Sequence, residues 1–321
     1  MNEKSSKNNY LVILIVLLLV VAIITGAGLC YLSWSDDTLS SSTETKGTEV
    51  TTESEGTTES ILSTETTEMT EPEESTEFVE VTTETTEAER EILSANTVTM
   101  EQIEIMEDGE YQYIKEGKVA SHKGIDVSKY QGNVDWKKVA EDGVEYAFIR
   151  VGCRGYGSSG TLIKDEKFHR NVKGALEQGI KVGAYFFTQA ITKEEALEEA
   201  ELVVKELGDY KITYPVAIDV ERIQGSKARQ DKLTAKERTE ICKVFCEKIK
   251  EAGFIPMVYG DSETFAELII PEELAAYDFW ICETDGSMKF PYEFAVWQYS
   301  HKGTVSGIKT ETNISISLKE W

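Results

Sequence analysis

Hydrophobic and polar positions divide the 321-residue chain into three stretches of different character. Residues 11–32 form an apolar run without a charge, long enough at 1.5 Å per residue to cross a hydrocarbon core of roughly 30 Å. Residues 33–97 are rich in Thr, Ser and Glu, a composition that buries too little apolar surface to fold. Short apolar runs and amphipathic stretches begin at Val98, which indicates that the folded part of the chain starts there.

Strand-like and helix-like patterns alternate through this last stretch. Residues 98–122 predict a short hairpin that leads into a domain at 123–321. Apolar runs in the domain predict eight strands, at 124–128, 146–152, 181–189, 215–221, 255–260, 279–283, 296–300 and 312–317. Helices are predicted between the first five strands, because capping residues and later glycines bound amphipathic segments at Asp135 to Gly143, Asp165 to Gly179, Thr192 to Gly208 and Thr234 to Gly253.

The order of these elements predicts the fold class. Strict alternation of strands and helices produces a parallel sheet with right-handed crossovers and helices on its outside. Five strand–helix units followed by three strands with little helix between them therefore predict an α/β protein, an irregular TIM-like (β/α)5(β)3 barrel.

The fourth predicted strand ends in two acids. Its sequence from Tyr214 to Glu221 is Y-P-V-A-I-D-V-E, an unalternating apolar run typical of a strand buried on both faces. Because side chains repeat with period two along a strand, Asp219 and Glu221 point to the same side. A solvated strand end that meets nearby lysines would also fit this triplet, so the rest of the chain must decide its role.

Acidic, aromatic and amide residues follow several other predicted strands. If the strands close into a barrel, their carboxyl ends share one mouth. Flat aromatic rings stack on sugar faces and carboxylates transfer protons, so this mixture is typical of a saccharide site. The pattern places there Asp126, Tyr130, Arg150, Tyr156, Tyr185, Phe187, Asp219, Glu221, Tyr259, Trp297 and Gln298. Tyr185, Phe186 and Phe187 alternate inward and outward, so we expect at least one of them in the core.

At these residues the chain resembles the glycoside hydrolase family 25 lysozymes, the Chalaropsis-type muramidases. The resemblance runs from Lys123 to Ser317. The motifs that carry it are G-I-D-V-S-K-Y-Q-G at 124–132, I-R-V-G-C-R-G-Y-G at 149–157, V-G-A-Y-F-F at 182–187, I-D-V-E at 218–221 and V-W-Q-Y-S at 296–300. It implies the same irregular barrel, and cleavage of the β-1,4 bond between N-acetylmuramic acid and N-acetylglucosamine in peptidoglycan.

The resemblance also implies roles for individual residues. Glu221 falls on the general acid, and Asp219 on the aspartate that assists the substrate's own N-acetyl group, so that configuration is retained. Asp126 falls on a third, supporting carboxylate. Clustered carboxylates oppose each other's ionisation, which is consistent with one acid staying protonated near neutral pH. No cofactor or metal is implied, and we expect a monomer that binds peptidoglycan glycan strands.

One position departs from the family pattern. Where the family usually has an aspartate in its last strand, this chain has Asn313 in Thr312-Asn313-Ile314-Ser315, and a two-residue slip would bring Glu311 to that place. Asparagine keeps the shape of the side chain but loses the charge. We count Asn313 among the substrate-binding residues. Two alternatives therefore stay open: a peptidoglycan-binding module with impaired catalysis, and a glycosidase that acts on another N-acetylated polymer.

Charge and cysteine usage exclude other classes of protein. The net charge of −25 is concentrated in residues 36–97, where eighteen acids against Lys46 and Arg90 give −16. No basic stripe remains to replace phosphate counterions, so nucleic acid is excluded as a partner. Cys242 and Cys246 lack the spacing of a zinc site, so we interpret the cysteines after Cys30 as buried thiols, with a disulfide through Cys153 or Cys282 left open. We assign no catalytic role to His122, His169 or His301.

The N-terminal third predicts a location at the cell membrane. Residues 1–10 carry Lys4 and Lys7 and acids follow the apolar run, so we expect a single span at 11–32 with its amino end inside and the domain extracytoplasmic. Small residues around Thr25 leave secretion by a cleaved signal peptide as the alternative. Residues 33–97 would then be a disordered tether with an end-to-end distance of about 45 Å.

Overall fold

The structure is a computed structural model that describes residues 93–225 and 227–321. The predicted membrane span at 11–32 and most of the predicted tether at 33–97 lie outside the described residues. Within the part of the chain that is described, no helix combines the length and the apolar character needed to cross a membrane.

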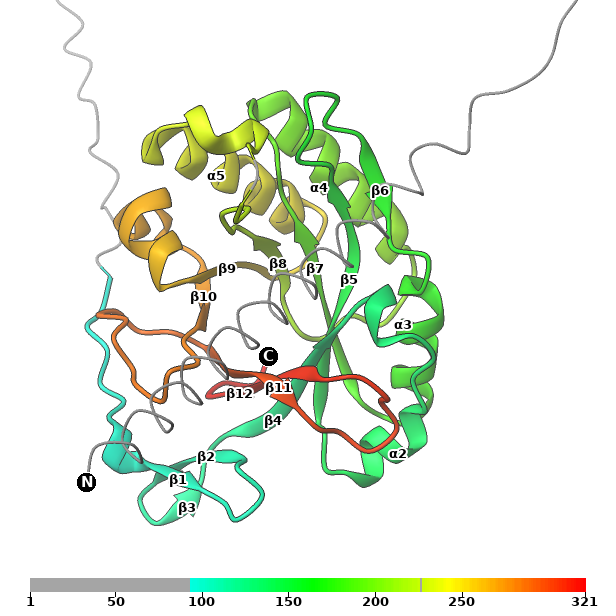
Figure 1. The fold of residues 1–321 in the computed structure, drawn as a ribbon, viewed down its shortest axis with the longest axis vertical. Coiled ribbons are helices and arrows are strands. Elements are labelled where there is room, and N and C mark those ends of the chain that lie inside the picture. Colours follow the sequence, from blue (N-terminus) through cyan, green and yellow to red (C-terminus); the bar gives the residue numbers. More distant parts are fainter. Residues whose placement is uncertain (1–92, 226) are drawn as a thin grey trace, which may run out of the picture. The chain divides into compact units, whose positions relative to one another are not determined.

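Eight strands close into a barrel, as the alternating pattern predicts (Figure 1). Seven are parallel, and β12 runs antiparallel to both of its neighbours, β11 and β4. The pairing of β4 with both β5 and β12 closes the ring. In order around the barrel the strands are β4 (His122–Val127), β5 (Tyr146–Arg154), β7 (Lys181–Phe187), β8 (Val216–Asp219), β9 (Pro256–Asp261), β10 (Asp278–Cys282), β11 (Val296–Gly303) and β12 (Thr312–Ser317).

Four α-helices connect the first five barrel strands along the outside of the ring (Figure 1). They are α2 (Trp136–Glu141), α3 (Phe168–Glu177), α4 (Lys193–Leu207) and α5 (Ala235–Glu251). The Thr192 and Thr234 side chains cap α4 and α5 by accepting hydrogen bonds from the backbone N–H groups of Glu195 and Glu237, as the sequence predicts. After β9 the connection holds only a π-helical turn, η4 (Thr264–Leu268), and a 3-10 turn, η5 (Pro271–Leu274), so the barrel is irregular in its last third.

The β5–α3 connection differs from the prediction. A short strand that the sequence pattern did not reveal, β6 (Leu162–Lys164), pairs antiparallel with the end of β5. Asp165 does not cap the next helix, because α3 begins only at Phe168. The Asp165 carboxylate instead accepts hydrogen bonds from Arg150 and from the backbone N–H of Lys129, which joins this connection to the loop after β4.

The hairpin predicted ahead of the domain is a three-stranded sheet. It contains the 3-10 turn η1 (Met100–Gln102), β1 (Ile103–Ile105), β2 (Tyr111–Lys115) and β3 (Lys118–Val119). The Tyr111 ring stacks on Tyr299 at 4.3 Å and meets Trp297 edge-on at 5.4 Å between ring centroids. The sheet therefore covers the outer face of β11, where the barrel has no helix.

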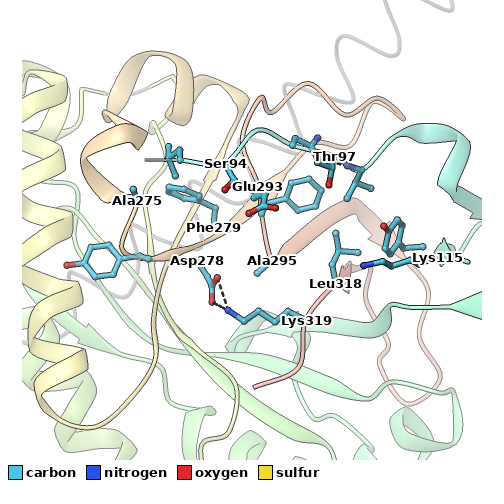
Figure 2. Close-up of a pocket in the computed structure, with 16 residues that line it drawn as sticks. Ser94, Thr97, Lys115, Ala275, Asp278, Phe279, Glu293, Ala295, Leu318 and Lys319 are labelled. Atoms are coloured by element: carbon cyan, nitrogen blue, oxygen red, sulfur yellow. Dashed lines mark hydrogen bonds and ion pairs between the residues drawn. The ribbon is translucent and has the colours of Figure 1, made fainter. Parts of the chain in front are cut away.

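The predicted boundary of the disordered tether at residue 97 is too late. Ala95 forms a β-bridge with Tyr292, and the backbone N–H of Asn96 donates to the carbonyl of Pro291 at 2.9 Å. Beside this segment lies a cavity of about 470 Å³, bordered by the Asp278–Lys319 ion pair (Figure 2). Asp278 begins β10, so this cavity lies at the amino ends of the parallel strands, opposite the end where active sites form in such barrels.

Aromatic rings fill the inside of the barrel. Tyr146 stacks on Tyr214 at 4.6 Å, and Phe148 stacks on Trp280 at 4.3 Å between ring centroids. These rings need space on neighbouring strands, and a Cβ at Gly124 would overlap the Tyr146 ring. The interior is therefore a packed core, and polar side chains lie above it at the carboxyl ends of the strands.

Two 3-10 turns complete the elements. They are η2 (Lys129–Gln131), which follows β4, and η3 (Arg229–Lys232), which precedes α5. The Ser128 and Gln131 side chains form a capping box around η2, which fixes the loop that carries Tyr130.

Candidate active site

Closure of the barrel brings three acids together, one from the first strand and two from the fourth. Asp126 lies on β4, Asp219 is the last residue of β8, and Glu221 follows two residues later. The N–H of Val220 donates to the carbonyl of Tyr259 on β9, so the pairing of β8 with β9 continues past the end of the strand. This backbone contact holds Glu221 at the mouth of the barrel.

Asp126 is buried and accepts two hydrogen bonds from side-chain amides. Gln298 Nε2 lies 2.7 Å from Asp126 Oδ2, and Asn313 Nδ2 lies 2.9 Å from Asp126 Oδ1. Burial raises the pKa of Asp126 to about 7, while the two amide donors oppose this rise. Both oxygens of the carboxylate are therefore oriented by the protein.

Glu221 lies beside a tyrosine. Tyr259 Oη lies 3.3 Å from Glu221 Oε1 and 3.0 Å from Gln298 Oε1, so this hydroxyl joins Glu221 to the residue that holds Asp126. Burial and then the neighbouring Asp261 carboxylate raise the pKa of Glu221 above its ordinary value. A raised pKa keeps a proton on a carboxyl group, which is the property that a general acid needs.

Asp219 is the most perturbed acid of the three. Burial, followed by the charges of Glu221 and Asp126, raises the pKa of Asp219 well above its ordinary value. Its Oδ1 atom is buried and has no hydrogen-bond partner among the described residues. Buried carboxyl oxygens are normally paired, so Asp219 offers an acceptor to a group that enters the mouth.

Arg150 on β5 places a positive charge beside this cluster. Its charge lowers the pKa values of both Asp126 and Asp219. Its guanidinium lies 2.7 Å from the Asp165 carboxylate and 5.0 Å from the centre of the Tyr130 ring. Arg150 thus favours the ionised forms of Asp126 and Asp219 and contacts the aromatic side chain of Tyr130 at the rim.

Tyr130 is the predicted sugar contact with the most exposed ring. Tyr130 is 53% exposed, and an exposed aromatic ring can pack against the apolar face of a sugar. Tyr185 and Phe187 are half-buried, whereas Phe186 between them is fully buried in the core as expected. Tyr156 is half-buried in the loop after β5, where its carbonyl accepts a hydrogen bond from the N–H of Arg229.

Three predicted sugar contacts need correction. Trp297 is 0% exposed, because it points outward from the barrel against Tyr111 of the three-stranded sheet β1–β2–β3. Its indole N–H donates to the carbonyl of Glu283. Gln298 is 1% exposed, and Tyr259 packs against Trp280 with centroids 4.5 Å apart. Gln298 and Tyr259 contact the acids through hydrogen bonds, whereas Trp297 faces away from the mouth.

The position that departs from the family pattern is resolved by strand register. Asn313 on β12 is paired directly with Asp126 on β4. Glu311 precedes β12 and is exposed, so the two-residue slip does not occur. The amide therefore occupies the place beside Asp126.

Sequence reasoning missed two residues at the edge of the cluster. Cys282 Sγ, at the end of β10, lies 3.4 Å from His301 Nε2, and His301 Nδ1 lies 3.4 Å from Asn313 Oδ1. Nineteen residues separate the cysteine from the histidine, and irregular register between β11 and β12 brings His301 to Asn313, so no spacing in the sequence signals this contact. The four cysteines of the described residues are free thiols.

No group of three or more His, Cys, Asp or Glu side chains within 93–225 and 227–321 is arranged to hold a metal ion. The mouth presents clustered carboxyl groups, one arginine and the amides that contact them.

Comparison with known proteins shows similarity along the barrel. The uncharacterized protein YegX of Escherichia coli strain K12 is 26% identical over 207 residues, which cover 60% of this chain and 68% of that protein. The autolytic lysozyme of Clostridium acetobutylicum is 25% identical over 193 residues, which cover 60% of this chain and 54% of the lysozyme. The chain thus matches little more than half of that lysozyme.

Solved structures agree with the fold. The modular autolysin LytC from Streptococcus pneumoniae aligns with a TM-score of 0.56 at 22% identity, over 67% of this chain and 51% of LytC. A family 25 glycosyl hydrolase from Bacillus anthracis aligns with a TM-score of 0.51 at 25% identity, over 61% of this chain and 88% of that one.

The family comparison covers the strands that carry the three acids. Residues 125–308 match the family described as glycosyl hydrolases family 25, and this segment is more than half of the 321-residue chain. Together with the barrel and the carboxyl groups at its mouth, this match shows that the chain belongs to glycosyl hydrolase family 25.

Proposed function

We propose that the protein is a peptidoglycan hydrolase, a muramidase that cleaves the β-1,4 bond between N-acetylmuramic acid and N-acetylglucosamine. The observation that carries the proposal is the pairing of Glu221, whose pKa is raised by burial, with Asp219, whose Oδ1 atom is buried and unpartnered, in a chain of this family. The similarity to an autolytic lysozyme supports the choice of substrate.

Glu221 acts as the general acid in this proposal. Cleavage of a glycosidic bond needs a proton on the leaving oxygen as positive charge develops on the sugar ring. Burial raises the pKa of Glu221, which favours the protonated carboxyl group, and Tyr259 contacts that group. Proton transfer of this kind contributes about 10²- to 10⁴-fold to the rate.

Asp219 assists the sugar's own N-acetyl group. Its free Oδ1 atom accepts the acetamido N–H, which turns the acetamido oxygen toward the anomeric carbon as the nucleophile. The positive charge that forms in the transition state favours the ionised form of Asp219. Attack by the acetamido oxygen and then by water inverts the anomeric carbon twice, so configuration is retained.

The test follows the products of bacterial peptidoglycan digested with the full chain. Borohydride reduction of the new ends should convert N-acetylmuramic acid and leave N-acetylglucosamine unreduced, and proton NMR should detect the β anomer first. Reduced N-acetylglucosamine would contradict the bond assignment, and the α anomer would contradict attack by the acetamido group. Binding without new reducing ends would favour a wall-binding module, and digestion of chitin alone would favour another N-acetylated polymer.

We further propose that residues 11–32 anchor the protein in the cell membrane with the barrel extracytoplasmic, and that residues 33–92 act as its tether. The uncharged apolar run and the acidic, Thr-rich composition support this. Protease added to intact spheroplasts should remove the barrel and leave a membrane-bound N-terminal fragment, whereas a barrel protected until lysis would refute the topology.

A further inference from the structure

A second row of polar side chains leads to Asp126 from the edge of the mouth. Cys282 Sγ lies 3.4 Å from His301 Nε2, His301 Nδ1 lies 3.4 Å from Asn313 Oδ1, and Asn313 Nδ2 lies 2.9 Å from Asp126 Oδ1. These residues come from β10, β11, β12 and β4, which are consecutive around the barrel. The acid is thus joined to an exposed histidine through one amide.

The direction of each hydrogen bond in this row follows from its neighbour. A carboxylate only accepts, so the Asn313 amide must turn its N–H group toward Asp126 and its oxygen toward His301. That oxygen also only accepts, so the proton of a neutral His301 resides on Nδ1. Nε2 is then an acceptor, and the Cys282 thiol donates to it.

The row through Gln298 obeys the same logic. Gln298 turns its N–H group toward Asp126, so its oxygen accepts the single hydroxyl hydrogen of Tyr259. The Tyr259 hydroxyl also lies within 3.3 Å of Glu221 Oε1, so Gln298 and Glu221 share this single donor. Both rows therefore end in an amide that donates to Asp126, which favours the ionised form of this acid.

We propose that Asn313, oriented by His301 and Cys282, is a positioning residue that favours the ionised form of Asp126 by donating a hydrogen bond to its carboxylate. The catalytic consequence rests on the proposed muramidase function. The effect of the amide on Asp126 does not, because the hydrogen bond between them exists whatever reaction the protein catalyses.

An amide at position 313 differs from a carboxyl group in one physical respect. A carboxyl group there would donate a hydrogen bond to Asp126 only while protonated, so the two acids would titrate as a pair. The Asn313 amide donates at every pH. The hydrogen bond that Asp126 receives from position 313 is therefore the same at every pH. The other titratable or charged groups that face Asp126 are Tyr146 and Arg150 on β5, Tyr185 on β7, Asp219 and Glu221 at the end of β8, Tyr259 on β9 and Cys282 on β10.

The experiment compares the pH dependence of kcat for the full chain and four variants on soluble peptidoglycan fragments. Asn313→Leu keeps the size of the side chain but removes the donor to Asp126, so the pKa of Asp126 should rise. The acidic limb of the pH profile of kcat should then move to higher pH by about one to two units, with little change in KM. Asn313→Asp should keep the acidic limb of this profile and add a new alkaline limb. The carboxyl group at position 313 donates to Asp126 only while it is protonated, and this donor is lost when both acids ionise. His301→Leu should shift the acidic limb less than Asn313→Leu, and His301→Gln, which retains a side-chain N–H donor, should restore it.

A matched substitution controls for added charge. Asn133→Asp introduces the same charge beside Lys167 and Arg170, which Asn133 contacts outside the acid cluster, and its profile should overlay that of the unmodified chain. Profiles of Asn313→Leu that differ from the unmodified chain only by a constant factor at every pH would overturn the proposal, because a merely structural role scales the rate without moving a limb.

A second readout is independent of catalysis. Carbon-13 NMR of chains labelled at aspartate carboxyl groups, with the Asp126 signal identified by its loss in Asp126→Asn, reports the ionisation of Asp126 directly. Asn313→Leu should raise the midpoint of this titration by the same one to two pH units. An unchanged midpoint overturns the inference even if the chain hydrolyses peptidoglycan, and a shifted midpoint in a chain without hydrolysis sustains the inference while the proposed function fails.

Discussion

Replacing Arg150 with methionine should destabilise the barrel strongly, because it leaves a buried carboxylate without its charge partner. The Asp165 side chain is 0% exposed and lies 2.7 Å from Arg150 Nη2. Two unit charges about 4 Å apart interact by about 4 kcal/mol at an effective dielectric constant of about 20. The backbone N–H groups of Lys129 and Lys167 also donate to Asp165, but they carry no full charge to replace the guanidinium.

We therefore expect Arg150→Met to lower the free energy of unfolding by about 3–5 kcal/mol, the range measured when one partner of a buried ion pair is removed. The double variant with Asp165→Asn should recover about 2 kcal/mol or more of that loss, because neither charge is then left alone. Urea unfolding of the full chain, followed by tryptophan fluorescence, measures both quantities.

Lys137→Met supplies the control for this prediction. It removes the same charge from an exposed pair with Glu141, 3.8 Å away, and should change the free energy of unfolding by less than about 0.5 kcal/mol. The reasoning is refuted if Arg150→Met costs no more than this control, or if the losses from the two single variants simply add in the double variant.

Substitutions at three further positions test other parts of the barrel. Tyr130→Ala should raise KM about tenfold with little change in kcat, because an exposed sugar platform is lost, whereas Tyr130→Phe should behave like the unmodified chain in the same kinetic assay. Gln298→Leu should lower kcat at neutral pH and shift its acidic limb to higher pH, because Asp126 loses a donor; an unmoved limb in the pH profile would show that the amide has no such effect. Gly124→Ala should cost about 1–3 kcal/mol or more of stability in urea unfolding, since the added methyl group overlaps the Tyr146 ring, and a fully stable variant would mean that the interior is less tightly packed than described.

The barrel could be predicted because its strands carry the signal in their own residues. Val216 to Ile218 form an apolar run without alternation, which only a strand buried on both faces requires. The capping threonines before α4 and α5 mark helix starts through local hydrogen bonds. Such signals depend on neighbours along the chain and survive without knowledge of the tertiary structure.

The errors arise where distant segments decide the outcome. Trp297 and Gln298 were both expected at the mouth, but alternation along β11 turns only the amide inward. The sheet that contains Tyr111 covers the Trp297 indole on the outside. β6 is only three residues long and exists through its pairing with β5. Nothing in the local sequence reports either contact.

The acids of the site were identified in the sequence, but their ionisation was not. Asp126 owes its state to amides on β11 and β12, more than 170 residues away along the chain. The contact of His301 with Asn313 depends in the same way on irregular strand register. Sequence motifs therefore predict which groups form the site, whereas their pKa values and hydrogen bonds depend on contacts that form when the barrel closes.

The central claim is that Glu221 donates the proton in cleavage of peptidoglycan, and one comparison of rates tests it directly. The release of reducing N-acetylmuramic acid should fall by about 10²-fold or more in Glu221→Gln, which keeps the shape of the side chain but holds no acidic proton. Glu311→Gln, at an exposed glutamate just before β12, should retain the full rate. Equal rates for the two variants would contradict the account, as would loss of activity in Glu311→Gln alone.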